Sequence, residues 1–345
     1  MKTLLIIVAL AIGYLSGCVC ADTAATDSSG SGITARELDA IKKQAINPDG
    51  QPVVEIAPEV WQVLTPKQTA ALYQRAADGK NADAMALLGL LYGKGMGVPR
   101  DRSKALALFK QSAELQSGLG MFMMSLTSSR DSNSTPGEAE VWLKKSADAG
   151  YGKALTELGV REYQGVGAAP NPLLAAQYFN RAASAGDPDA YDFLGQLSMS
   201  GAGVPQSTDT AFKDFNKAAE SGSARGAYDL GMAYMQGVGV KVDNSKAFES
   251  FQKAANGGFA LGMLNTGALL ENGQGVAKDE AKAAEWYQKA ADAGVAAADD
   301  NLAQLYEDGR GVPKDHAKAV ALMQTAASGG DMSAAQWLAA HHESP

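Results

Sequence analysis

The chain has 345 residues, 46% of them hydrophobic, and a formal net charge of −8. The apolar content is enough for a packed core. An acidic chain has no electrostatic reason to bind nucleic acid or an anionic membrane surface, whereas a basic partner would be attracted to it. Both cysteines, Cys18 and Cys20, lie among the first 20 residues, so no disulfide framework holds the rest of the chain.

Residues 1–17 have the pattern of a secretory signal. Lys2 is followed by an apolar run from Leu4 to Leu15, which is too short to span a membrane comfortably. The segment ends in Leu-Ser-Gly-Cys18, which resembles a bacterial lipobox. That resemblance implies cleavage before Cys18, lipidation of its thiol and a periplasmic protein that touches a membrane only through this anchor.

The residue after the cysteine bears on which membrane is used. Val19 stands where an aspartate is associated with inner-membrane retention, so the analogy favours the outer membrane. Two alternatives stay open. Cleavage after Ala21 would give a plain periplasmic or secreted protein, and an uncleaved segment would itself be the anchor.

Residues 18–65 are expected to form a tether and an irregular lead-in. Asp22–Gly32 is small and polar, as in a flexible linker, and Ile33–Gln44 is compatible with a short helix. Four prolines between residues 47 and 66 predict an irregular path. We expect the apolar residues of this stretch to cover the edge of the array that follows: Val53, Val54, Ile56, Val60, Trp61 and Leu64.

From residue 66 the chain is periodic. A Gly-x-Gly turn begins at six positions, 36 residues apart except for a first interval of 70: Gly95, Gly165, Gly201, Gly237, Gly273 and Gly309. An alanine keeps the same step through seven units: Ala105, Ala139, Ala175, Ala211, Ala247, Ala283 and Ala319. A fixed period of this length is typical of a solenoid, in which each unit buries its apolar face against its neighbours.

Residues 81–117 show one unit. Apolar residues at helical spacing predict a first helix that ends at Gly95 and Gly97, since glycine permits the positive φ of a tight turn. Pro99 keeps that helix from continuing, and Asp101 stands where the N-cap of a second helix belongs. Helices at 67–78 and 332–341 are expected to cap the two ends.

The second unit departs from the pattern. Met123 takes the place of the first-helix glycine, and the stretch from Thr127 to Gly137 lacks Gly-x-Gly. The interval from Ala105 to Ala139 falls to 34 residues. We expect an irregularity here, with a loop that is a candidate contact site.

The recurring A-x3-L-G-x2-Y-x2-G-x-G-V-P-x-D-x2-K-A pattern resembles Sel1-like repeats, relatives of the tetratricopeptide repeat, over about residues 66–330. Departures are Glu162, Ser198 and Leu270 at the tyrosine and Ala303 at the glycine. The resemblance implies an all-α, right-handed superhelical solenoid of about seven helix-turn-helix repeats with terminal capping helices, over residues 66–345. It also implies an adaptor that binds other proteins, without saying which.

In tetratricopeptide arrays the open positions of the first helices lie at −6, −3, +1, +4 and +5 from the helix glycine, on one helical face. Transferred here, they predict a groove with a Tyr-Met centre and an acidic C-terminal end, formed by Asp189, Asp192, Gln196, Met199, Arg225, Tyr228, Met232, Met235, Leu264, Glu271, Asp300, Gln304 and Glu307. Two alternatives stay open: Met232 and Met235 pack against the next unit, and the acids form only a solvated face.

The sequence offers no chemistry for catalysis. The three histidines, His316, His341 and His342, show no metal-ligand spacing, so no metal or other cofactor is expected. Gly93-Lys94-Gly95 misses the phosphate-loop motif, and no G-x-S-x-G elbow occurs. Some cysteine-rich Sel1-like proteins are linked to β-lactam hydrolysis, but those have a disulfide per repeat, so this reading is the weakest.

We therefore expect a non-catalytic, exported adaptor. The resemblance to effector-linked Sel1-like lipoproteins makes the most specific reading an inhibitor or immunity protein, which holds a secreted effector of lipase or phospholipase type in its groove. The alternative is an envelope scaffold for polysaccharide export or for a sensor complex.

Overall fold

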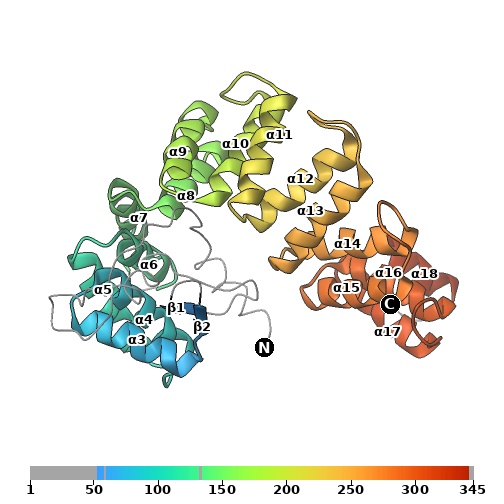
Figure 1. The fold of residues 1–345 in the computed structure, drawn as a ribbon, viewed down its shortest axis with the longest axis horizontal. Coiled ribbons are helices and arrows are strands. Elements are labelled where there is room, and N and C mark those ends of the chain that lie inside the picture. The colour runs from blue at the N-terminus through green and yellow to red at the C-terminus, as the bar shows by residue number, and fades with distance from the viewer. Residues whose placement is uncertain (1–52, 58–59, 132–133, 342–345) are drawn as a thin grey trace. The chain divides into compact units, whose positions relative to one another are not determined.

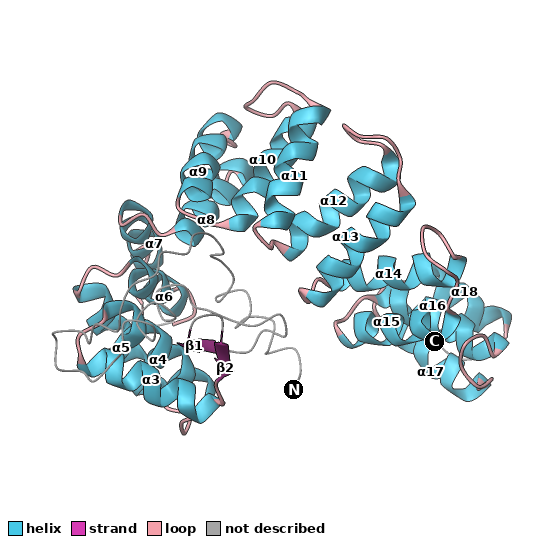
Figure 2. Cartoon of the chain, in the orientation of Figure 1, coloured by secondary structure: helices cyan, strands magenta, loops and turns pink. Residues whose placement is uncertain are grey.

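The computed structural model describes residues 53–57, 60–131 and 134–341, with side chains from Leu64 on. The predicted signal, Cys18, the tether and the helix expected at 33–44 lie outside these residues. The described residues form sixteen helices after a hairpin of β1 (Val53–Ala57) and β2 (Val60–Val63) (Figures 1 and 2). The helices are α3 (Pro66–Asp78), α4 (Ala82–Lys94), α5 (Arg102–Glu114), α6 (Gly118–Ser128), α7 (Glu138–Asp148), α8 (Gly152–Gln164), α9 (Pro172–Ser184), α10 (Pro188–Ser200), α11 (Thr208–Glu220), α12 (Ala224–Gln236), α13 (Asn244–Asn256), α14 (Ala260–Asn272), α15 (Glu280–Asp292), α16 (Ala296–Asp308), α17 (His316–Ser328) and α18 (Met332–Ala340).

The described residues make two compact units. The N-terminal unit runs to Ala190 and includes Ala202–Val204, and the C-terminal unit comprises Tyr191–Gly201 and the chain from Pro205. Consecutive helices pack against one another from α3 to α9 and from α11 to α18. We call the first helix of each repeat an A helix (α4, α6, α8, α10, α12, α14, α16) and the second a B helix (α5, α7, α9, α11, α13, α15, α17). The all-α solenoid predicted from the period is confirmed.

The helix ends follow the predicted signals. α4 ends at Gly95, which has a φ of 73° and donates its amide to the Leu91 carbonyl. The A helices α8, α12, α14 and α16 end at a left-handed glycine in the same way. Asp101 caps α5 by accepting the Lys104 amide at 2.9 Å. Aspartates cap three further B helices: Asp243, Asp279 and Asp315.

The A-helix glycine brings the two helices of a repeat together. A Cβ added at Gly231 would lie 2.7 Å from the ring of Phe251, and one added at Gly267 would lie 2.7 Å from the ring of Tyr287. Both rings are almost completely buried. The same contact occurs in three other repeats: Gly89 with Phe109, Gly159 with Phe179 and Gly195 with Phe215. The aromatic stripe of the B helices is therefore core.

The lead-in is more regular than its prolines suggested. Instead of an irregular path, β1 and β2 pair antiparallel, with Val53 opposite Val63 and Glu55 opposite Trp61. The prolines do not prevent this pairing, because none stands inside a strand: they precede β1, follow it, or begin α3. The expected cover of the first edge is confirmed for Leu64, which packs against the N-terminal core. The side chains of its companions lie outside the described residues.

The second repeat lacks the Gly-x-Gly turn as expected, but Met123 does not take the place of the helix glycine. That place lies eight residues after the A-helix N-cap, as Gly231 follows Ser223, and in α6, which is capped by Ser117, Ser125 holds it.

The irregular repeat has structural consequences. In five other repeats the second turn glycine rests on the start of an earlier helix, as Gly203 rests on Pro172. At Gly167, which follows the irregular repeat, nothing lies within 4 Å of an added Cβ. Leu106 is 44% exposed, whereas the residue at its register in α11, Phe212, packs beside Tyr234 of the next repeat at 5.3 Å.

Candidate partner-binding face

The predicted groove residues of the C-terminal unit lie on A helices α10, α12, α14 and α16. Three rows hold the same register in successive repeats, and together we call them the A-helix face: Asp192, Tyr228, Leu264 and Asp300; Gln196, Met232, Ala268 and Gln304; Met199, Met235, Glu271 and Glu307. Asp189 belongs to the N-terminal unit, where its charge acts on Lys153 and Asp187. It is therefore not grouped with the A-helix face.

Side-chain contacts join neighbouring A helices along this face. Gln196 of α10 donates its amide to Asp229 of α12 at 3.1 Å. The Asn265 amide of α14 lies 3.9 Å from the Met232 sulfur of α12. Asp229 and Asn265 were missed by the sequence analysis, although both stand two residues before the helix glycine. In these two repeats the residue at that position makes a side-chain contact with the preceding repeat.

The centre of the A-helix face is apolar and half-buried. The Tyr228 ring packs 5.1 Å from Phe259 and 5.5 Å from Phe251, measured between ring centroids. Met232 and Met235 pack partly against the core formed by Ala247, Phe251 and Leu269. Leu269 belongs to α14 of the next repeat, so part of the surface of each methionine packs against the next unit, as the alternative interpretation expected. Leu264 is half-buried as well.

Two aliphatic side chains on these helices are more exposed. Met199 of α10 is 39% exposed, and Leu261 at the start of α14 is 41% exposed. Leu261 was not among the predicted groove residues, yet it holds the −6 offset that had selected Arg225 one repeat earlier. The apolar strip of the face thus consists of Tyr228, Met232, Met235, Leu261 and Leu264.

Asp192 is not open. Its side chain is fully buried, the Arg225 Nε lies 3.0 Å from its Oδ2, and Gln196 donates to the same oxygen at 2.9 Å. Arg225 also lies 5.0 Å from the centre of the Phe193 ring and stays 46% exposed. The pair joins α10 to α12, because each charge is satisfied by the other helix.

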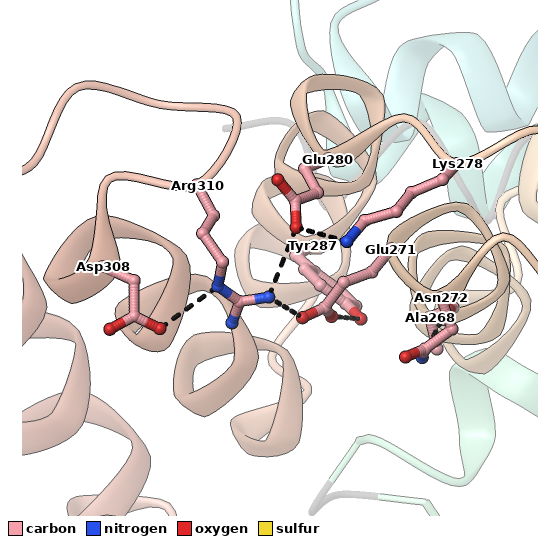
Figure 3. A network of polar contacts seen from close by, with 8 residues as sticks. All are labelled: Ala268, Glu271, Asn272, Lys278, Glu280, Tyr287, Asp308 and Arg310. Atoms are coloured by element: carbon pink, nitrogen blue, oxygen red, sulfur yellow. Dashed lines mark hydrogen bonds and ion pairs between the residues drawn. The ribbon is translucent and has the colours of Figure 1, made fainter.

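Glu271 is held in a polar network (Figure 3). It accepts a hydrogen bond from the Tyr287 hydroxyl at 2.7 Å and pairs with Arg310 at 2.8 Å. Arg310 also contacts Asp308 at 3.1 Å and Glu280 at 3.6 Å. Burial, reinforced by the bond to Glu271, raises the pKa of Tyr287. This predicted groove acid links the sixth repeat to the turn of the seventh.

The acids of α16 differ from one another. Glu307 accepts from His316 Nδ1 at 2.6 Å and lies 3.8 Å from Lys314, and the bond to His316 lowers the pKa of Glu307. Asp300 is half-buried and accepts only the Gln304 amide, at 3.3 Å, among the hydrogen bonds of the described residues. Burial raises the pKa of Asp300, and the charge of Asp331 adds to the effect.

Within the described part of the chain, no three His, Cys, Asp or Glu side chains are grouped to hold a metal ion. No helix in that part combines the length and apolar character needed to cross a membrane. The ionisable groups of the A-helix face make ion pairs and hydrogen bonds to side-chain amides, between repeats at Asp192 and Glu271 and within α16 at Asp300. No nucleophile and base are brought together among them.

The chain belongs to the Sel1 repeat family. Its repeats match residues 82–117, 121–151, 152–187, 188–223, 224–259, 260–295 and 296–331. The irregular second repeat is included, as the shortest match. No curated protein matches the chain.

Several solved structures are similar. A Sel1 repeat protein from Oxalobacter formigenes is 31% identical with a TM-score of 0.55, over 78% of each chain. A protective antigen of uropathogenic Escherichia coli is 27% identical with a TM-score of 0.54. That match covers 78% of this chain but 58% of the antigen, so the chain spans less than two thirds of that relative. An immunity protein from Pseudomonas aeruginosa is 23% identical with a TM-score of 0.45, over 57% of this chain and 76% of that one.

Proposed function

We propose that this Sel1 repeat protein is a non-catalytic adaptor that binds a segment of another protein on the A-helix face. The apolar strip on α12 and α14 carries the proposal. Tyr228 and Leu264 are left half-buried at the same register of two adjacent repeats, and Met232 is half-buried one helical turn after Tyr228. Leu261 is 41% exposed. Aromatic and methionine side chains are enriched at protein interfaces, where methionine adapts to irregular partners. Sel1 repeats are used for protein interaction, which agrees with this role.

The finer proposal is an inhibitor that holds a secreted effector of lipase or phospholipase type. An inhibitor that blocks its effector by binding it one to one needs a binding face and no reacting groups. The A-helix face offers an apolar strip, and its ionisable groups are paired with other side chains. The resemblance to effector-linked Sel1-like lipoproteins supports this reading. The Pseudomonas immunity protein shares only the fold with this chain and adds no support. We place the protein in the periplasm, anchored through Cys18, on the lipobox resemblance alone.

The test begins with the partner recovered by affinity purification from the envelope of the source bacterium. Tyr228→Ala with Met232→Ala removes much of the apolar strip, so we expect at least about tenfold weaker binding of that partner. The matched control is Val242→Ala with Met332→Ala, two residues of the same unit that are 60% and 76% exposed away from the strip. Circular dichroism checks that both variants are folded.

Unchanged binding by the Tyr228/Met232 variant would contradict the proposal, as would an equal loss in the control. An adjacent gene for a toxic lipase would favour the inhibitor. A polysaccharide operon around the gene would favour the envelope scaffold instead.

A further inference from the structure

Charge is divided unequally between the two rows of helices in the C-terminal unit. A helices α12, α14 and α16 contain six carboxylates and a single basic residue, Arg225. The carboxylates are Asp229, Glu271, Asp299, Asp300, Glu307 and Asp308. B helices α13, α15 and α17 contain five lysines against four carboxylates. Among these six helices the acidity is therefore concentrated on those that carry the A-helix face.

Several of these acids already have a cation. Arg310 pairs with Glu271 and Asp308, and His316 binds Glu307. Asp229 and Asp300 are different, because each accepts an amide of glutamine: Gln196 at 3.1 Å for Asp229 and Gln304 at 3.3 Å for Asp300. No ion pair of the described residues includes either of them.

These two carboxylates lie on opposite sides of the apolar strip. Asp229 faces back toward α10 through Gln196, and its charge helps to raise the pKa of the neighbouring Tyr228, after burial. Asp300 holds on α16 the register that Leu264 holds on α14. Burial raises the pKa of Asp300, so its ionised form is under-solvated in the free protein. A cation at this point would therefore be favourable.

The spacing limits the kind of segment that fits. Side-chain contacts link α12 to α14, through Asn265 and Met232, and α14 to the turn after α16, through Glu271 and Arg310. We therefore take the usual spacing of about 10 Å between neighbouring helices, which gives about 20 Å from α12 to α16. An extended chain advances about 3.3 Å per residue, so about six residues cover that distance. A segment with apolar side chains at its centre and a basic residue near each end would satisfy the strip and both carboxylates together.

We propose that the A-helix face takes a segment of the partner protein in which apolar side chains are flanked by lysine or arginine. The apolar side chains lie over Tyr228, Met232 and Leu264, and the two cations lie at Asp229 and Asp300. This inference rests on the proposed function and names the chemistry of the segment that is bound.

The experiment uses the full chain after signal removal and an array of synthetic peptides. Each peptide has a varied centre of leucine, phenylalanine and methionine, flanked by lysines about six residues apart. Matched peptides carry glutamine or glutamate in place of the lysines. For the best lysine peptide, fluorescence anisotropy is expected to show at least about tenfold weaker binding of the glutamine form and weaker binding still of the glutamate form. Salt should weaken the lysine peptide most.

Variants locate the effect. Asp229→Asn with Asp300→Asn should abolish the preference for lysine over glutamine. Glu249→Gln with Glu285→Gln removes the same charge from exposed positions of the B helices and should leave the preference intact. Equal affinity for the three peptide forms, no binding by any of them, or an equal effect of the B-helix variant would overturn the inference.

The outcomes separate this inference from the proposed function. If all peptide forms bind equally and the Tyr228/Met232 variant loses them all, the face binds polypeptide without reading charge. If the lysine peptides bind that variant normally, the site lies elsewhere and both proposals fail.

Discussion

At the scale of single residues, the A-helix glycine and the B-helix aromatic form one unit of packing. The two repeats that lack the glycine also lack the ring. In the second repeat Ser125 holds the glycine register, eight residues after the N-cap Ser117, and is matched by Leu143. In the seventh repeat Ala303 is matched by Met323. Leu143 and Met323 stand four residues after the repeat alanine, as the rings do. Leu143 and Met323 are almost completely buried, like the rings they replace. A flexible or aliphatic side chain leaves the room that a Cβ requires, so the exchange preserves packing density.

This pairing predicts a coupled effect on stability. Gly231→Ala puts a methyl group 2.7 Å from the Phe251 ring, and we expect the strain to cost about 1–3 kcal/mol, beyond the helix propensity gained. Adding Phe251→Met copies the Ala303–Met323 pair and should recover part of the loss. Urea unfolding of the four proteins gives the coupling energy. Strictly additive effects would show that glycine and ring are independent.

Asp187 predicts a dependence of stability on pH. It is buried and accepts the Thr156 hydroxyl at 2.5 Å, while its Oδ1 has no hydrogen-bond partner. Burial, the largest cause, raises the pKa of Asp187 above 3.8, although nearby Lys153 opposes the shift. The protonated carboxyl therefore stabilises the folded chain at acidic pH, and that contribution is lost as the pH rises through the folded-state pKa.

Asp187→Asn should thus gain stability relative to the natural chain as the pH rises from acidic to neutral. We expect the gain to be largest at neutral pH and to shrink in acid. Urea unfolding at several pH values measures it. A difference between the two proteins that does not change with pH would contradict this account of Asp187.

At the scale of elements, five Gly-x-Gly turns rest on the start of an earlier helix, and the turn that follows the irregular second repeat does not. Gly167 and Gly203 compare the two situations, because both lie in the N-terminal unit and have similar φ values of 79° and 72°. Alanine at either position suffers the left-handed penalty of about 1–2 kcal/mol. Only at Gly203 does the added Cβ also meet backbone, 2.4 Å from the Pro172 carbonyl carbon.

Gly203→Ala should therefore destabilise the chain by clearly more than Gly167→Ala. The expected difference is on the order of 1–3 kcal/mol, which is the range for forced overpacking. Urea midpoints of the two variants give the comparison. Equal losses would mean that the turn contact contributes nothing.

Local signals made the repeating elements predictable. The turn glycines, the capping aspartates and the alanine register act within a few residues of one another, so the pattern reports them directly. The hairpin was not predicted, because the number of prolines in a stretch does not say whether they occupy paired positions. The valines of Val53–Val63 favour a strand, and every proline of the stretch stands outside the paired residues.

The candidate site was less predictable, because its contacts join different repeats. The row positions followed from the offset to the helix glycine. Whether an acidic side chain of this face is available to a partner depends on whether a residue 33 to 39 positions away pairs with it. Arg225 pairs with Asp192 in this way, and Arg310 pairs with Glu271. The period places two such residues side by side, but their identities change from repeat to repeat. Arg310 occupies a turn position that holds glutamine one repeat earlier.

At the scale of the whole molecule, the anchor predicts where the protein is found. If Cys18 carries a lipid, Cys18→Ser should move the protein from the membrane fraction to the soluble periplasmic fraction, because stable anchoring here depends on the acylated cysteine. Immunoblotting of the separated fractions measures the change. Continued membrane association of the variant would argue for an uncleaved segment or for another contact.

The central claim is that the A-helix face is where a partner protein binds. Site-specific photo-crosslinking tests it most directly, with a benzophenone side chain placed in turn at Leu261 and Gln304 on A helices and at Glu285 on a B helix. With the purified partner present, we predict crosslinks from Leu261 and Gln304 and none from Glu285. Crosslinks from Glu285 with none from the A-helix positions would contradict the account.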